Sequence, residues 1–199
     1  MLPDPIKKFA DVFGKLPSIG PRQALRLAFY LAGEDRGLLR EVESAAKNLN
    51  SIKICGKCFY THTQKNNLCE ICVNQSRNQK VIAILEKSTD LMSLEKTKKF
   101  GGRYLVLGNL QKNGVMDMEQ KLRLETLKRF IAKELCGKAD EIILAINPTA
   151  YGNLNAAMLQ RELTPFTAKL SRLGRGIPTG GEIEFADEET LGAALERRS

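Results

Sequence analysis

The spacing of apolar and polar residues changes character along the chain. Over the first fifty residues apolar side chains recur at helical spacing, which predicts three short helices. The first is expected to start with Asp4 as its cap and Pro5 as its first helical residue, and to end at Gly14. The second is expected over 21–32 and the third over 37–51. The third helix has an apolar stripe that we expect to pack on the first two, formed by Leu38, Val42, Ala45, Ala46 and Leu49.

Beyond residue 80 short apolar runs alternate with amphipathic segments. Strands are predicted over 81–85, 104–107 and 142–146, and helices over 89–99, 119–135 and 154–163. This alternation favours a parallel sheet with helices on both faces. The polar segment 73–80 is interpreted as a linker. The glycine-rich segment Gly174–Gly181 is interpreted as a connecting loop, followed by a strand over 182–185 and a closing helix from Asp187.

Four cysteines between these two regions form two Cys-X-X-Cys pairs separated by ten residues: Cys55, Cys58, Cys69 and Cys72. Each pair on a tight turn offers two thiolates, and two such pairs can surround one zinc ion tetrahedrally. Two disulfides, or four unrelated thiols, are the alternatives. We expect one structural Zn²⁺ per chain, because a closed shell of four ligands leaves no position for a substrate. Such a small module would fold only with its metal.

Two other residues bear on this site. His62 lies between the pairs and could replace a thiolate, but with four cysteines present we expect it at the surface. Cys136, near the end of a predicted helix, is expected to be a buried or unreactive thiol. Reduced, metal-bound thiols are typical of the cytoplasm. The first ten residues lack the apolar core of a signal peptide, and the longest apolar run, six residues, is too short to span a membrane.

The net charge of +8 is unevenly distributed over the 199 residues. Residues 1–80 carry 13 Lys/Arg and 7 Asp/Glu, whereas residues 81–199 carry 18 and 16. A basic N-terminal part indicates an acidic partner, and nucleic acid is the first candidate.

The first two predicted helices are joined by Leu16-Pro-Ser-Ile-Gly-Pro, which predicts a helix-hairpin-helix. The turn would leave backbone N–H groups free at the start of the second helix, where a phosphate can bind. Arg22 and Arg26 would lie on one face of that helix. With Lys15 and Gly20 they form the candidate DNA-binding site. An ordinary helical hairpin with a solvated basic face is the alternative.

Ligands of parallel sheets bind beyond the carboxyl ends of the strands. The sequence places Glu86, with Asp90 one turn later, at one strand end, whereas Gly108-Asn109 and Asn147-Pro148 follow the other strands. Metal-assisted phosphoryl transfer needs several carboxylates around Mg²⁺. Amides at two of three strand ends therefore argue against an enzyme.

Several motifs, taken in order, resemble the RecR family of bacterial recombination mediators. They are Leu16-Pro-Ser-Ile-Gly-Pro-Arg, the paired cysteines, Leu85-Glu86-Lys-Ser-Thr-Asp90, Gly102-Arg103-Tyr104, Asn147-Pro148-Thr149 and Gly176-Ile-Pro-Thr-Gly-Gly-Glu182. The resemblance covers nearly the whole chain. It implies an α+β multidomain protein: a helix-hairpin-helix DNA-binding domain over 1–54, a zinc finger over 55–79, a Toprim domain over 80–175, and a C-terminal strand and helix over 176–199.

The resemblance also implies a function. Members of the family form tetrameric rings that encircle DNA, and they work with RecO and RecF to help RecA displace single-strand-binding protein at gaps. By position, Arg22 and Arg26 match the basic residues of the hairpin, and Glu86 and Asp90 match the Toprim acidic pair. The chain departs from the family pattern at Ser18, Ser88, Asn113 and the segment Tyr151-Gly152-Asn153. The last two departures remove carboxylates, which puts in doubt any metal- or RecO-dependent role of those positions.

The sequence therefore favours a DNA clamp of recombinational repair that has no catalytic activity and binds DNA without sequence preference. One alternative is a metal-dependent Toprim nuclease or topoisomerase-like enzyme, because a fold alone does not fix function. Another is a zinc-containing RNA-binding or scaffold protein.

Overall fold

The computed structural model describes residues 2–33, 36–174 and 176–196. The chain divides into two compact units, Met1–Ile52 and Lys53–Ser199, and each is described by itself. Within the described residues no helix combines the length and apolar character needed to cross a bilayer.

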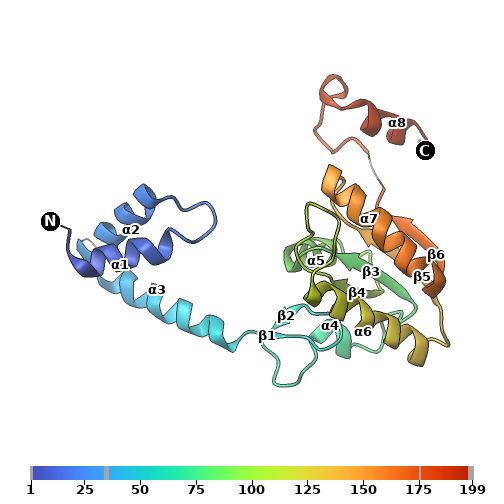
Figure 1. The fold of residues 1–199 in the computed structure, drawn as a ribbon, viewed down its shortest axis with the longest axis horizontal. Helices are drawn as coiled ribbons and strands as arrows, with labels where there is room; N and C mark the ends of the chain where they lie inside the picture. Colours follow the sequence, from blue (N-terminus) through green and yellow to red (C-terminus); the bar gives the residue numbers. More distant parts are fainter. Residues whose placement is uncertain (1, 34–35, 175, 197–199) are drawn as a thin grey trace. The chain divides into compact units, whose positions relative to one another are not determined.

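In the N-terminal unit the described residues form only helices: α1 (Asp4–Phe13), α2 (Pro21–Gly33), α3 (Arg36–Asn48) and the 3₁₀ turn η1 (Leu49–Ser51) (Figure 1). Three predicted helices are thus present. The helix α1 begins one residue earlier than predicted, because Pro3 is its cap and Asp4 is its first helical residue. Within α1 the rings of Phe9 and Phe13 are stacked, with 3.9 Å between their centroids.

The expected packing of α3 is only partly correct. Leu38 and Val42 are half-buried, but Ala45 and Ala46 are exposed and Leu49 is 68% exposed. Among the described residues of this unit, the buried apolar side chains all belong to α2, namely Ala24, Ala28 and Leu31. The helices α1 and α2 pack on each other, whereas the last turn of α3 and η1 are exposed. The apolar periodicity of the sequence predicts a buried face but not how far along the helix the burial extends.

The second unit is built on a four-stranded parallel sheet of order β4-β3-β5-β6. Its strands are β3 (Val81–Leu85), β4 (Arg103–Val106), β5 (Ala139–Ala145) and β6 (Thr167–Arg172). The helices that follow or precede them are α5 (Ser88–Lys96), α6 (Met118–Glu134) and α7 (Ala150–Leu163), with the 3₁₀ turn η2 (Thr164–Phe166) before β6. The predicted parallel α/β sheet is confirmed.

Alternation along the strands directs side chains to two cores, because successive residues of a strand face opposite sides of a sheet. Ile82 and Ile84 of β3 belong to the larger core, with side chains of α6 and α7. Ala83 and Leu85 belong to a smaller core, with Leu91 of α5. Helices therefore cover both faces, as predicted.

Two predictions about the C-terminal region are wrong. The strand β6 was not expected, because its sequence Thr-Ala-Lys-Leu-Ser-Arg has no apolar run; as an edge strand it needs none. Conversely, residues 182–185 do not form a strand. They contain the 3₁₀ turn η3 (Ile183–Phe185), which pairs with no other strand, and α8 (Glu188–Glu196) follows it. The loop before η3 agrees with the prediction, except that Arg175 lies outside the described residues.

The small cysteine module contains β1 (Lys53–Ile54), β2 (Thr61–His62) and α4 (Glu70–Val73) and packs on the edge of the sheet. The N–H of Val106 in β4 donates a hydrogen bond to the carbonyl of Cys58, at 2.8 Å. Phe59 packs against both cores of the sheet, and Tyr60 against the smaller one. The module therefore covers part of the outer edge of β4 and pairs the Val106 N–H, which an open edge would leave unpaired.

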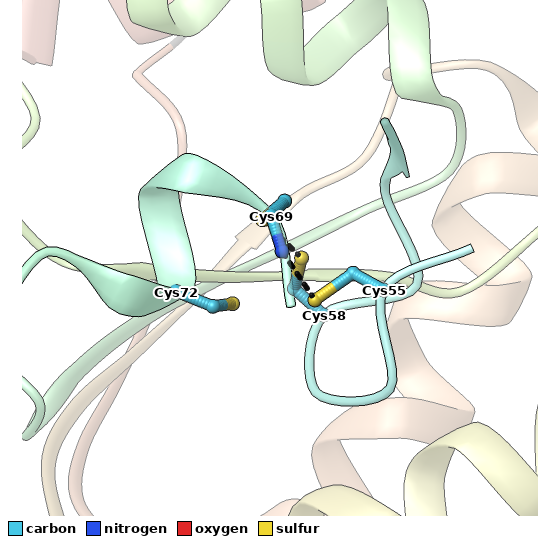
Figure 2. A group of neighbouring side chains, drawn as sticks. All are labelled: Cys55, Cys58, Cys69 and Cys72. Atoms are coloured by element: carbon cyan, nitrogen blue, oxygen red, sulfur yellow. Dashed lines mark hydrogen bonds between the residues drawn. The ribbon is translucent and has the colours of Figure 1, made fainter. Parts of the chain in front are cut away.

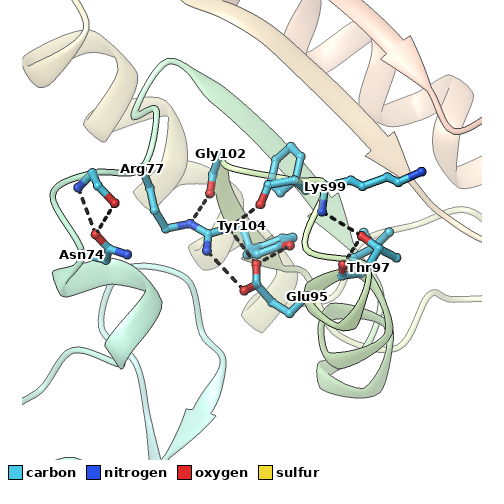
Figure 3. Close-up of polar contacts among 10 residues, drawn as sticks. Asn74, Arg77, Glu95, Thr97, Lys99, Gly102 and Tyr104 are labelled. Carbon is cyan, nitrogen blue, oxygen red and sulfur yellow. Dashed lines mark hydrogen bonds and ion pairs between the residues drawn. The ribbon is translucent and has the colours of Figure 1, made fainter.

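The polar segment predicted as a linker is tied to the sheet by one arginine (Figure 3). The guanidinium of Arg77 donates two hydrogen bonds to the Glu95 carboxylate, at 2.7 and 3.2 Å, and others to the carbonyls of Phe100 and Gly102. The Tyr104 hydroxyl donates to the same carboxylate, at 2.7 Å. A partly buried ion pair thus fastens segment 73–80 to α5 and β4.

Candidate functional site

The four predicted cysteines converge in the second unit (Figure 2). The sulfur atoms of Cys55, Cys58, Cys69 and Cys72 all lie within 4.8 Å of one another. The first pair lies on the turn after β1, and the second pair lies at the start of α4, where Cys69 is the cap and Cys72 is in the helix. Sulfur atoms around a tetrahedral zinc ion are about 3.8 Å apart when each Zn–S bond is about 2.3 Å. The donor set therefore fits one metal ion.

The protonation of the cluster supports the same conclusion. The thiols Cys58 and Cys69 approach to 3.5 Å between sulfur atoms, and the N–H of Cys69 donates to the Cys55 sulfur at 3.4 Å. Hydrogen bonds from the other thiols lower the pKa of Cys55, whereas the neighbouring sulfurs and burial raise the pKa of Cys58. Negative charge on one sulfur thus opposes charge on the next, and a divalent cation is what allows all four to ionise.

The prediction that His62 lies at the surface is wrong. Its side chain is only 8% exposed, on the strand β2. Its Nδ1 accepts a hydrogen bond from the N–H of Gln64, at 3.2 Å. The thiolates complete the ligand set without it, since His62 is not part of the metal-binding group.

The remaining cysteine was expected to be either buried or unreactive, and the first of these alternatives is wrong. Cys136 is exposed, and it adopts a left-handed backbone with φ of 54° two residues after the end of α6. It lies outside the cysteine cluster.

The hairpin in the first unit has the geometry that the sequence predicts. Ser18 turns the chain with φ of 66°, and α2 begins at Pro21 with the N–H of Ala24 bonded to the carbonyl of Gly20. The N–H groups of Arg22 and Gln23 consequently have no acceptor within the helix.

The basic side chains around the turn are accessible. Arg22, Arg26 and Lys15 are all exposed, and within the described part of the chain none of them has an ion pair. Because α2 is a regular helix, Arg22 and Arg26 lie on the same face, one turn apart. A Cβ atom on Gly20 would meet nothing within 4 Å, so the turn is open to a ligand.

Glu86 and Asp90, which by resemblance match the acidic pair of Toprim domains, make different contacts. The Asp90 carboxylate accepts the N–H of Lys87 at 2.9 Å as part of a capping box at the start of α5. Glu86, largely buried, accepts the N–H of Leu110 at 3.4 Å and lies 3.9 Å from the Lys87 ammonium. Among the described residues the four cysteines form the only group of three or more potential metal ligands, so Glu86 and Asp90 are not joined by a third acid.

A hollow of about 590 Å³ lies where the carboxyl ends of β3 and β5 meet the C-terminal segment. Asp90 lines it, with Asn147 and Arg172, but Glu86 does not. Arg172 donates to the Asn153 side-chain oxygen at 2.9 Å. Asn153 is one of the positions where the resemblance would place an acid. In this chain its side-chain amide, and not a carboxylate, accepts the hydrogen bond from Arg172.

Fold and site together define a class: a Toprim-domain protein that carries a four-cysteine metal module and a separate helical hairpin. The sequence model of the "Toprim domain" matches residues 80–174, and that described as "RecR, C-terminal" matches residues 176–199. Among curated proteins, "Recombination protein RecR" of Roseiflexus castenholzii is 36% identical over 100% of this chain and 95% of its own length. The proteins of the same name from Herpetosiphon aurantiacus and Frankia alni are 35% and 34% identical, over 98% and 97% of this chain and 94% and 95% of their own length. The chain belongs to the RecR family.

Membership confirms the resemblance seen in the sequence and sets the broad function. The relatives are named recombination proteins, so this chain is a recombination mediator and not a Toprim enzyme. A Toprim fold does not by itself fix the function of a chain.

Proposed function

We propose that this protein is a DNA-binding mediator of recombinational repair in the cytoplasm. It acts as an oligomeric clamp, with a tetramer expected, at gaps where single-stranded and double-stranded DNA meet. There it helps load the recombinase together with RecO and RecF. Family membership supports the general role, and the hairpin of the first unit supports DNA as the ligand.

The observation that carries the proposal is the open turn before α2. Free N–H groups at Arg22 and Gln23 point out of the helix start, and the helix dipole places partial positive charge there. The guanidinium groups of Arg22 and Arg26, and the ammonium of Lys15, add full charges beside it. Such groups contact phosphates and not base edges, so binding should not depend on sequence.

The cysteine module supports a structural Zn²⁺, one per chain. Four thiolates satisfy a tetrahedral ion completely, and three of the four cysteines are buried. The ion would hold together the turn after β1 and the start of α4. Through the Cys58 carbonyl it would also fix the edge strand β4.

Exposed apolar side chains support assembly into an oligomer. In the first unit Val12 is 59% exposed, Phe29 51% and Tyr30 50%. In the C-terminal segment Ile183 is 69% exposed and Phe185 79%. Exposed large apolar side chains are candidates for contact with another chain, and the described part of the first unit, with three buried apolar side chains, has little core of its own.

The test is the affinity for a fluorescent gapped DNA at moderate salt. The Arg22→Ala/Arg26→Ala double variant should bind at least about tenfold more weakly, because it loses two phosphate contacts. Lys7→Ala/Lys8→Ala is the matched control, since it removes two charges from α1 of the same unit and should bind like the wild type. Equal losses in both variants would show that the binding depends on charge alone and not on the hairpin.

A further inference from the structure

Arg103, the first residue of β4, is a buried cation without an anion. Its side chain is 7% exposed, and its Nη1 atom is buried without a hydrogen-bond partner. Its closest described interaction is with the ring of Phe130, whose centroid lies 3.8 Å from the guanidinium carbon. Buried charges are almost always paired, because leaving water costs far more than an aromatic ring returns.

The same cation borders a small hollow at the surface of the second unit. The hollow has a volume of about 30 Å³ and lies between the first Cys-X-X-Cys turn, the start of β4 and the middle of α6. Lys57 of that turn lines it, together with Arg103, Thr126 and Phe130. This volume holds one water molecule or one anionic oxygen, but not a whole phosphate or carboxylate group.

More positive charge lies beside the hollow. Arg129 and Lys133 share the face of α6 that presents Thr126 and Phe130, because they follow at helical spacing, and both are exposed. Glu134 ends the same helix, but within the described residues it is paired with neither Arg103 nor Lys57.

Several other cations of this unit have an acid partner. Arg77 pairs with Glu95, Arg123 with Glu119, and Lys128 with both Glu125 and Glu162. Around the hollow, by contrast, four cations on three separate elements have no ion pair among the described residues, and Arg103 is buried as well. A single side-chain carboxylate would neutralise one of them, whereas a polyanion can pair with several.

We propose that Arg103 and Lys57, flanked by Arg129 and Lys133, form a second contact site for the phosphate backbone of DNA, outside the hairpin. One phosphodiester oxygen enters the hollow to reach the Arg103 guanidinium, and Lys57 and Arg129 pair with the exposed oxygens. The inference rests on the proposed function, because it takes DNA as the ligand. It assigns to the cysteine module a second role, which is to hold Lys57 at the rim.

The first experiment uses exposed residues, so that the fold is preserved. The affinity of Lys57→Gln/Arg129→Gln for gapped DNA is measured over a series of salt concentrations. We expect a loss of about threefold or more per contact, and a salt slope that is lower by about two, because fewer counterions are released. Lys65→Gln, which removes a charge from the same module far along the loop, should leave both quantities unchanged. An unchanged slope in the double variant overturns the proposal.

The second experiment addresses Arg103 itself. Arg103→Met keeps an apolar stem over Phe130 and should lower DNA affinity while zinc content and melting temperature stay at or above their wild-type values, because a buried unpaired charge is removed. DNA affinity unchanged in this variant would contradict the proposal and would indicate that the anion comes from an acidic protein surface. If Arg22→Ala/Arg26→Ala weakens binding and these variants do not, only the second site fails. If the wild type does not bind DNA, the proposed function fails as well.

Discussion

Ser18 shows how one residue determines the shape of the candidate DNA-binding turn. Its backbone has φ of 66°, a left-handed conformation that costs an L-residue roughly 1–2 kcal/mol. The resemblance to the family would place glycine here, and glycine adopts this conformation freely. The chain therefore forms the hairpin with local strain, which the contact between α1 and α2 must offset.

We predict that Ser18→Gly stabilises the N-terminal unit by about 0.5 kcal/mol, since relief of strain exceeds the entropy that glycine adds to the unfolded chain. Hydrogen exchange of the amides in α1 and α2 measures the change in the full-length protein. Ser18→Ala is the control, because it removes the hydroxyl and keeps the strain. Equal protection in the glycine and alanine variants would contradict this explanation.

For single residues, the sequence predicted correctly those positions at which the spacing between residues determines which side chains lie together. The four cysteines meet because each Cys-X-X-Cys turn brings two sulfur atoms together, and Arg22 and Arg26, four residues apart, share a helix face. The prediction for His62 was wrong and none was made for the burial of Arg103; both residues are buried by tertiary packing. No local pattern reports that burial, so the unpaired guanidinium became visible only in the structure.

The cysteine module and the edge strand β4 are coupled by a backbone hydrogen bond. The Cys58 carbonyl lies within a metal-binding turn and also accepts the hydrogen bond from Val106. Metal binding should therefore stabilise β4 as well as the module.

Cys69→Ser should abolish zinc binding, and the Val106 amide should exchange at least about tenfold faster, equivalent to about 1.4 kcal/mol of lost protection. Cys136→Ser is the matched control, since this exposed thiol lies outside the cluster and its loss should change neither quantity. Metal analysis and hydrogen exchange test the two parts separately. Full zinc content in Cys69→Ser would refute the four-thiolate site.

The Arg77–Glu95 pair predicts a specific dependence of stability on pH. Burial raises the pKa of Glu95, but hydrogen bonds from Arg77 and Tyr104 lower it by more, and the net pKa is below its ordinary value. A carboxyl group with a lowered folded-state pKa stabilises the protein above the unfolded-state pKa, and this contribution is lost as pH falls through the folded-state value.

Glu95→Gln should thus lower the free energy of unfolding by about 2 kcal/mol at neutral pH. The difference from wild type should shrink as pH falls below about 4. Urea unfolding at several pH values measures it. Glu188→Gln, at an exposed position in α8, should show no comparable effect. A difference that does not change with pH would contradict the ion pair.

The elements that the sequence predicted well are those with buried apolar runs. The strands β3, β4 and β5 are such runs, and their predicted ends differ from the observed ones by three residues or fewer. The helix α7 begins four residues earlier than predicted, because the Thr149 hydroxyl caps it by accepting the N–H of Gly152. The strand β6 escaped prediction because its partner β5, and not its own sequence, determines its conformation.

For the molecule as a whole, charge and exposed apolar surface point to two kinds of partner. The positive charge is concentrated in residues 1–80, which contain the hairpin and the cysteine module. The exposed apolar residues of the first unit and of the C-terminal segment suit copies of the same chain. In the first unit these two proposed surfaces adjoin, because Phe29 and Tyr30 follow Arg26 by three and four residues on α2.

The central claim is that the turn before α2 binds DNA phosphates through its backbone and its arginines. The most direct measurement is the NMR shift of the Gly20, Arg22 and Gln23 amides during titration of the full-length protein with gapped DNA. We expect these amides to shift together with increasing DNA and the change to be reversed by added salt. Amides that remain unshifted while the DNA is bound would contradict it.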